Sequence, residues 1–249
     1  MPRPRIIPVL LLDRKRRLVK TVQFGERTYI GDPFNVIRLF NEKEVDEIVV
    51  LDIDATVDNQ PADVGFLAEL ASECFMPLSY GGGLKSMDVC TGLARAGIEK
   101  FIIGSAIDDT DFLKEMTSSF GDQAVVACID YRQSTEGKTF TYSGKKQAAD
   151  NVIDHARRAQ DNNVGEIILQ SIDRDGMRIG MDLSMIKTVS QSVRVPLIAL
   201  GGAGDVDDLK PALDAGASAV ASGSAFSFIG RLRAVLISYP EYDDQRLQF

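Results

Sequence analysis

Short runs of apolar and β-branched residues alternate along this chain with longer stretches in which apolar positions recur at helical spacing. The short runs are almost continuously hydrophobic, which is typical of strands covered on both faces, and strands that alternate with helices form parallel sheets. The pattern predicts eight strands, at residues 5–11, 47–52, 76–80, 100–103, 123–130, 166–171, 195–200 and 219–222.

The stretches between these runs predict the helices. Pro33 falls in the first turn of the first one, where its missing N–H costs least. Three others open with Asp or Ser, residue types that cap helix N-termini. The predicted helices span residues 32–44, 63–73, 86–96 and 109–119, begin again near Ala149, Leu183 and Val206, and end with residues 231–237, which should complete an outer ring. Eight such units in 249 residues indicate one (β/α)8 barrel, a single domain over residues 1–249.

The chain also repeats itself. Shifting it by 119 residues aligns residues 77–106 with residues 196–225 without a gap, and ten of these thirty positions are identical. The same shift pairs Glu47 with Glu166 and Asp54 with Asp173. Two half-barrels of four units each are therefore expected, with sites in a two-fold arrangement.

Composition narrows the function classes. A net charge of −8 argues against nucleic-acid binding. There is no run of about 18 apolar residues, which argues against a membrane span, and the first five residues lack a signal-peptide core. We therefore expect a cytoplasmic protein. The three cysteines lack metal-site or redox spacing and are expected to be buried free thiols. His155, the only histidine, lies in a polar helical stretch and is predicted to face solvent. Neither a cofactor nor a metal is indicated.

Glycine pairs at strand ends carry the first candidate chemistry. Free backbone N–H groups and the dipole of the following helix make such loops suited to an anion, and the last two strands of a barrel often hold a phosphate. Because the loops recur at the 119-residue shift, a ligand with two phosphates could bridge the barrel mouth. The loops contain Gly82, Gly83, Gly104 and Ser105 in the first half, and Gly201, Gly202, Gly223 and Ser224 in the second.

Carboxylates at the strand ends are the candidate acids and bases. Asp130 closes an apolar strand, so its side chain should project into the mouth, where a carboxylate is costly unless it is used or paired. Asp54 and Asp173 are more simply helix caps or ion-pair partners. A basic cluster, residues 14–17 followed by Lys20, is either a solvated loop or an anion-catching one.

Several motifs, distributed from end to end, resemble those of the HisF synthase subunit of imidazole glycerol-phosphate synthase. They are Arg5-Ile-Ile-Pro, Leu51-Asp-Ile, Gly81-Gly-Gly, Ser143-Gly-Lys-Lys, Gly165-Glu-Ile-Ile-Leu, Ser171-Ile-Asp-Arg-Asp-Gly and Gly201-Gly-Ala-Gly. The resemblance implies that a glutaminase subunit docks on the N-terminal face of the barrel. Its ammonia would pass through the barrel to a phosphoribulosyl substrate, which is cleaved at the other face.

The resemblance also assigns residues. It implies a charged ammonia gate made of Arg5, Glu47, Lys100 and Glu166. These four residues all begin strands, so they point to the same end of the barrel. The alternative is a fixed, salt-bridged plug that closes this end. It implies phosphate contacts at Gly82, Ser105, Asp175, Gly176, Gly202, Gly223 and Ser224, and a loop lysine at Lys20 that would act with Asp130 in catalysis.

The reaction end departs from that family. The family has two catalytic aspartates, but the 119-residue shift places Leu11 opposite Asp130, and Asp13 could substitute only if its loop folds back. Gly104 stands where the family has asparagine, and Gln170 where it has threonine. Together with the chain ends, these departures resemble a paralogous branch that supplies nitrogen for acetamidino groups on bacterial surface sugars, with a third, sugar-binding amidotransferase as a further partner.

Three functions therefore stay open: a subunit that channels ammonia for sugar modification, a cyclase of histidine biosynthesis, and a non-catalytic conduit that activates its glutaminase. Leu11 argues against the cyclase, since ring closure needs two proton-transfer groups. The phosphate loops argue against the conduit.

Overall fold

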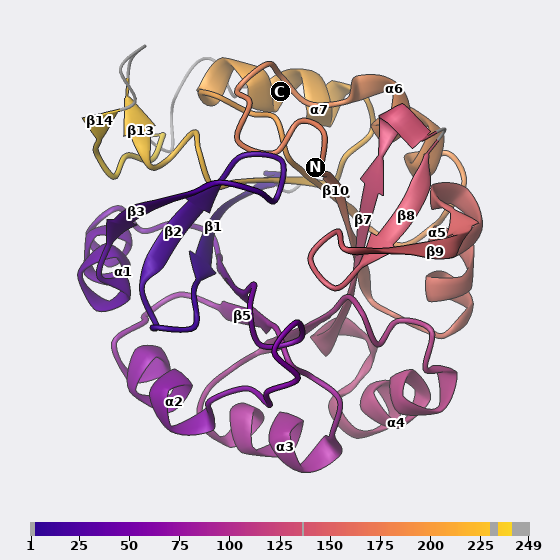
Figure 1. The fold of residues 1–249 in the computed structure, drawn as a ribbon, viewed down its shortest axis with the longest axis horizontal. Coiled ribbons are helices and arrows are strands. Elements are labelled where there is room, and N and C mark those ends of the chain that lie inside the picture. The colour runs from indigo at the N-terminus through magenta and orange to yellow at the C-terminus, as the bar shows by residue number, and fades with distance from the viewer. Residues whose placement is uncertain (1–2, 136, 230–233, 241–249) are drawn as a thin grey trace.

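The computed structural model describes residues 3–135, 137–229 and 234–240, and at its centre eight parallel strands close into a barrel (Figure 1). β12 pairs with β1, and β10 pairs with β7, so the ring has no free edge. All eight predicted strands are present, with ends within two residues of the prediction. They are β1 (Arg5–Leu12), β4 (Ile48–Asp52), β5 (Leu78–Gly81), β6 (Lys100–Ile103), β7 (Val125–Arg132), β10 (Glu166–Ser171), β11 (Leu197–Leu200) and β12 (Ala219–Ser222). The (β/α)8 prediction is confirmed.

Helices surround this barrel (Figure 1). Asp32, Asp63 and Asp109 accept hydrogen bonds from the first turns of their helices, as their residue type predicts. None of the helices in the described ranges is long and apolar enough to cross a membrane. They are α1 (Pro33–Glu42), α2 (Val64–Ser72), α3 (Met87–Arg95), α4 (Thr110–Phe120), α5 (Val152–Asp161), α6 (Leu183–Ser190) and α7 (Leu209–Asp214).

The predicted helix at residues 231–237 is wrong where it can be compared. Residues 231–233 lie outside the described part of the chain, but Ala234–Val235 forms strand β14, which pairs antiparallel with β13 (Phe228–Ile229). The apolar residues here alternate over too short a run to distinguish a strand from a helix. A short antiparallel strand pair therefore stands where the eighth helix was expected.

Side chains of the barrel strands alternate between two apolar clusters. In β1, Ile6 and Leu10 pack toward the helices, whereas Ile7, Val9 and Leu11 join the cluster inside the barrel. This alternation follows from the two-residue period of a strand. It also fixes which residues of each strand can reach the barrel axis.

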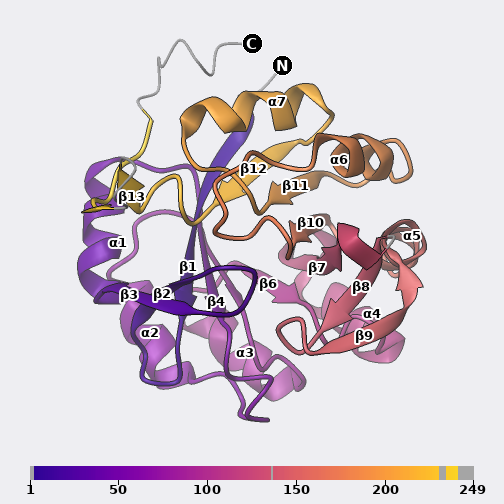
Figure 2. The same cartoon turned by 45° about the horizontal axis from the view of Figure 1, so that its top comes forward.

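Two hairpins rise from the C-terminal ends of opposite strands (Figure 2). β2 (Leu18–Thr21) and β3 (Arg27–Gly31) follow β1, and β8 (Lys138–Thr141) and β9 (Lys146–Asn151) follow β7. Because parallel strands share one C-terminal end, both hairpins lie at the same mouth of the barrel. The sequence analysis did not predict them.

His155 is buried, with 1% of its surface exposed, so the prediction that it faces solvent is wrong. Its Nδ1 lies 3.1 Å from Thr139 Oγ1 in β8. The β8–β9 hairpin packs against α5 and covers the histidine. Burial lowers the pKa of His155, so it is an uncharged structural side chain near neutral pH.

Candidate functional site

Four charged side chains meet at the N-terminal end of the barrel. Arg5 lies 2.5 Å from Glu47 and 2.6 Å from Glu166, and Lys100 lies 3.0 Å from Glu47 and 3.2 Å from Glu166. Each cation therefore bridges both carboxylates. The result is a closed ring of ion pairs, assembled from four separate strand starts.

Both carboxylates of this ring are buried, with 2% of Glu47 and 6% of Glu166 exposed. Ser79, which the sequence analysis did not single out, donates a hydrogen bond of 2.6 Å from its hydroxyl to Glu47. Buried charges need such complete pairing, because an unpaired one costs several kcal/mol, roughly 3–5 when one partner is removed. The ring closes one end of the barrel axis.

Lys20 lies in a small cavity at the other end. It is 5% exposed, and its ammonium donates to the Val9 carbonyl at 2.6 Å. Burial lowers the pKa of Lys20 to about 7, against a smaller opposing effect of Asp175. The cavity brings together every second-half phosphate residue predicted from sequence: Asp175, Gly176, Gly201, Gly202, Gly223 and Ser224.

Two glycines are required for this geometry. A Cβ on Gly223 would lie 2.3 Å from the Lys20 ammonium, so any side chain there would displace the lysine. A Cβ on Gly202 would lie 2.2 Å from the Gly180 carbonyl, and its φ of +109° is also unfavourable for other residues. Backbone and ammonium can thus approach one small anion together.

Binding of sulfate should depend on pH through Lys20. The ammonium is charged below its pKa of about 7 and neutral above it, so affinity should be highest below pH 7 and should fall as the pH rises. Sulfate does not titrate in this range, which isolates the lysine. Lys20→Met should weaken binding at pH 6 by at least about tenfold, the loss expected for one charged hydrogen bond, and should flatten the pH profile measured by calorimetry. An unchanged affinity would exclude Lys20 from the anion site.

The corresponding first-half cavity is built differently. It is lined by Gly82, Gly83, Gly104 and Ser105, as predicted, but no lysine equivalent to Lys20 is buried in it. Two of its polar groups already have partners: the Gly83 N–H donates to Thr56, and the Ser105 hydroxyl accepts from the Tyr142 N–H. The two-fold repeat therefore keeps the loops, but among the described residues the buried lysine, Lys20, lines the cavity of the second-half loops.

Asp130 faces a cavity of about 120 Å³ at the barrel mouth. Burial raises its pKa to about 7, and the only hydrogen-bonding contact of its side chain among the described residues is the thiol of Cys128, at 3.6 Å. Near neutral pH such a carboxyl group can both donate and accept a proton. Leu11, Gln170 and Gly104 line the same cavity.

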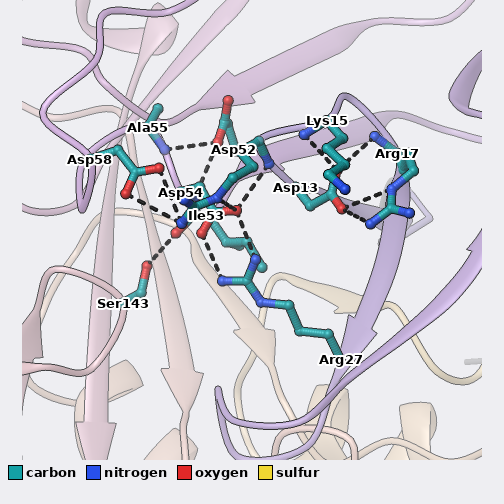
Figure 3. A network of polar contacts seen from close by, with 11 residues as sticks. Asp13, Lys15, Arg17, Arg27, Asp52, Ile53, Asp54, Ala55, Asp58 and Ser143 are labelled. Carbon is teal, nitrogen blue, oxygen red and sulfur yellow. Dashed lines mark hydrogen bonds and ion pairs between the residues drawn. The ribbon is translucent and has the colours of Figure 1, made fainter.

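Asp13 does not take the place of the missing strand-1 aspartate. Both of its oxygens are occupied outside the barrel mouth: one accepts from the Lys15 and Arg17 N–H groups, and the other lies 2.7 Å from the Arg17 guanidinium (Figure 3). Although burial raises the pKa of Asp13, the hydrogen bonds from Arg17 outweigh it and lower the pKa. The wall opposite Asp130 is therefore Leu11.

The basic cluster at residues 14–17 is not one anion site. Arg14 pairs with Asp58 at 3.2 Å, Arg16 pairs with Asp63, and Arg17 pairs with Asp13. These arginines are about half exposed or more, which fits the solvated-loop alternative, and Lys20 alone is buried.

The two candidate ion-pair carboxylates behave as expected. Asp54 receives both arms of Arg27 at 2.7 Å (Figure 3), and Asp173 pairs with Arg132 at 3.1 Å.

The hairpins supply residues to which the sequence analysis assigned no role. Phe24 and Arg27 from the first hairpin and Ser143 from the second line the mouth cavity. The Ser143 hydroxyl donates to the Ile53 carbonyl at 2.8 Å, which ties the second hairpin to the end of β4. The long stretches after the first and fifth strands were the available signal, since loops over a barrel mouth often carry function.

Comparison with known proteins agrees with this architecture. Residues 5–232 match the family model described as histidine biosynthesis protein. The chain belongs to this family. The match covers all eight barrel strands and both candidate sites.

Individual relatives of the family are similar over nearly their whole length. A Pseudomonas aeruginosa protein provisionally named imidazole glycerol phosphate synthase subunit hisF2 is 45% identical over 245 residues, which cover 97% of each chain. A Leptospira borgpetersenii protein with a provisional HisF name is 41% identical over the full length of both chains. Imidazole glycerol phosphate synthase subunit HisF of Hyphomonas neptunium is 39% identical over 231 residues, 92% of this chain and 91% of its own. The resemblance to HisF is confirmed.

No group of three histidine, cysteine or carboxylate side chains is arranged to hold a metal ion within residues 3–135, 137–229 and 234–240. Among the titratable side chains that line the two cavities at the mouth, Asp130 and Lys20 both have pKa values of about 7.

Proposed function

We propose that this protein is a HisF-type synthase subunit that receives ammonia from a glutaminase and delivers it to an acceptor at the C-terminal mouth. The relatives named imidazole glycerol phosphate synthase subunit support the reaction class. The ion-pair ring at one end and the anion cavity beside Asp130 at the other supply the two ends that such a transfer needs.

The acceptor in this proposal belongs to acetamidino-sugar biosynthesis rather than to histidine biosynthesis. One observation carries this choice: Leu11 occupies the position opposite Asp130, and the nearby Asp13 is held by Arg17. A histidine-pathway cyclase needs a second proton-transfer group there. The anion cavity with its buried lysine disfavours a purely passive conduit.

The proposed partners follow from the two ends. A glutaminase subunit would cover the face that bears the ring of Arg5, Glu47, Lys100 and Glu166. A phosphorylated small molecule would occupy the mouth, and a separate amidotransferase would hold the sugar. In this proposal the ring acts as a gate that opens when the partner is bound.

Lys100→Glu tests the gate. It places three carboxylates together, so the ring should lose its closed geometry, and nitrogen transfer from glutamine should fall at least about tenfold more than transfer fed by ammonium chloride. The readout is the residual, slow turnover of the phosphoribulosyl substrate in the complex with the glutaminase, compared between the two nitrogen sources. Lys114→Glu, the same charge change on the exposed face of α4, is the matched control and should leave the ratio unchanged. Equal losses with both nitrogen sources would mean that the ring is only structural.

A further inference from the structure

The second mouth hairpin, β8–β9, is attached to the barrel through His155 of α5. The histidine is 1% exposed, and its Nδ1 lies 3.1 Å from the Thr139 hydroxyl in β8. α5 contacts both strands of the hairpin, which stands at the mouth (Figure 2). The proposed function does not use this histidine.

Hydrogen bonds fix the tautomer of the neutral His155 ring. The Thr139 hydroxyl donates its only hydrogen to the Asp150 carbonyl at 3.0 Å, so it can only accept from the imidazole. Nδ1 therefore carries the ring hydrogen, and Nε2 is a bare acceptor. Nε2 is buried and has no hydrogen-bond partner among the described residues. Asp108 Oδ1, which is also an acceptor, lies 3.6 Å from it, and two acceptors cannot form a hydrogen bond.

Three charged side chains act on the ring: Asp108, Arg158 and Asp150. Arg158, one turn further along α5, pairs with Asp108 of the β6–α4 loop and with Asp150 of β9. Its guanidinium uses the same Asp108 oxygen that faces His155 Nε2. A proton on Nε2 would therefore compete with Arg158 for that oxygen and would place a second positive charge beside the guanidinium.

Protonation of the ring is costly while the hairpin is in place. A buried charge needs complete pairing, and the imidazolium would have to share its carboxylate with Arg158. Burial lowers the pKa of His155, and this effect outweighs the opposing effect of Asp108. Movement of the hairpin away from α5 would relieve the cost, because the charged ring would then reach water.

The far end of the same hairpin lies on the mouth cavity. The Ser143 hydroxyl donates to the Ile53 carbonyl at 2.8 Å, and the Tyr142 N–H donates to the Ser105 hydroxyl at 2.9 Å. Ser143 also lines the mouth cavity, so the position of the hairpin determines how open this side of the mouth is.

We propose that His155 is a pH switch for the second mouth hairpin: the neutral ring holds β8 against α5, and protonation favours a state in which the hairpin has moved away and the mouth is open. This inference goes beyond the proposed function and does not depend on it. The closed state binds the neutral ring. It is therefore fully favoured above about pH 6.5, the ordinary pKa of histidine, and it loses stability as the pH falls below that value.

Nitrogen NMR tests the tautomer directly, since His155 is the only histidine in the chain. In isotopically labelled protein at pH 7.5, Nδ1 should carry the proton and Nε2 should not. The ring should titrate below about pH 6.5. The opposite tautomer, or a ring that is charged at pH 7.5, would overturn the proposal.

Hydrogen exchange measures the release of the hairpin. Protection of the β8–β9 amides, corrected for the intrinsic effect of pH, should fall about three- to tenfold from pH 7.5 to pH 5.5, whereas that of the α2 amides should stay constant. Tenfold is roughly the limit, because a freed histidine with a pKa of about 6.5 takes up one proton over this range. Equal changes in the hairpin and α2, or no change in either, would exclude a local switch.

Two variants separate His155 from other titrating groups. His155→Asn places an amide donor where Nδ1 lies but cannot take up a proton, so protection of the hairpin should no longer depend on pH. Asp161→Asn removes a carboxylate from the exposed end of the same helix and should behave like the wild type. If His155→Asn keeps the wild-type pH dependence, another group causes it and the proposal is wrong. The wild-type NMR and exchange data decide the question even if the asparagine variant does not fold.

Discussion

Asp130→Asn should reduce turnover of the phosphoribulosyl substrate with ammonium by about 10² to 10⁴, the contribution typical of one general acid–base group. Asp130 is the carboxyl group of the mouth cavity whose pKa burial raises to about 7, and asparagine keeps its size while removing its titration. Rates with saturating substrate and ammonium chloride measure the loss. An unchanged rate would exclude Asp130 from catalysis.

The same variant should be no less stable than the wild type above pH 7. The pKa of Asp130 is raised in the folded state, so the folded protein binds more protons than the unfolded chain between pH 4 and 7. Stability from this group is therefore fully present at low pH and is lost as the pH rises through about 7. The thermal midpoint of Asp130→Asn, relative to that of the wild type, should therefore be higher at pH 8 than at pH 5. A difference independent of pH would place the Asp130 pKa near its ordinary value.

Leu11→Asp should increase turnover of the phosphoribulosyl substrate by at least about tenfold. It restores a carboxylate opposite Asp130, and one such group is worth about 10² to 10⁴ in rate when it is well placed. Recovery should be incomplete, because Gly104 and Gln170 also line the cavity and change its contacts. Tyr29→Asp, on the exposed side of β3, is the matched control. Leu10→Asp would not serve, because Leu10 packs in the core between the barrel and the helices. No gain in the Leu11 variant would mean that the missing aspartate is not what limits this substrate.

The parts of the molecule that follow from local periodicity could be predicted from sequence. Eight apolar runs fixed the barrel, and the repeat indicated which loops share a mouth, so the second-half phosphate loops and Asp130 were expected at the same end. The ring was expected for the same reason, because strand starts in a parallel barrel meet at one face.

Contacts between segments far apart in sequence could not be predicted in this way. His155 is buried only because the β8–β9 hairpin covers α5, and nothing in its polar neighbourhood indicates that. Arg14 and Arg16 pair with Asp58 and Asp63, which follow β4 in the chain. The spacing of the arginines in the sequence therefore could not show whether they form ion pairs or bind an anion. Ser79 gains its significance from its contact with Glu47. Register, not periodicity, decides such contacts.

The rate at which the wild-type protein converts the phosphoribulosyl substrate with added ammonia tests the central claim most directly. If Leu11 marks a subunit whose acceptor lies outside histidine biosynthesis, that rate should be at least about a hundredfold below that of a two-aspartate HisF barrel assayed in parallel. Turnover at ordinary enzymatic rates of roughly 1 s⁻¹ or more would contradict the claim and would make this protein a histidine-pathway cyclase.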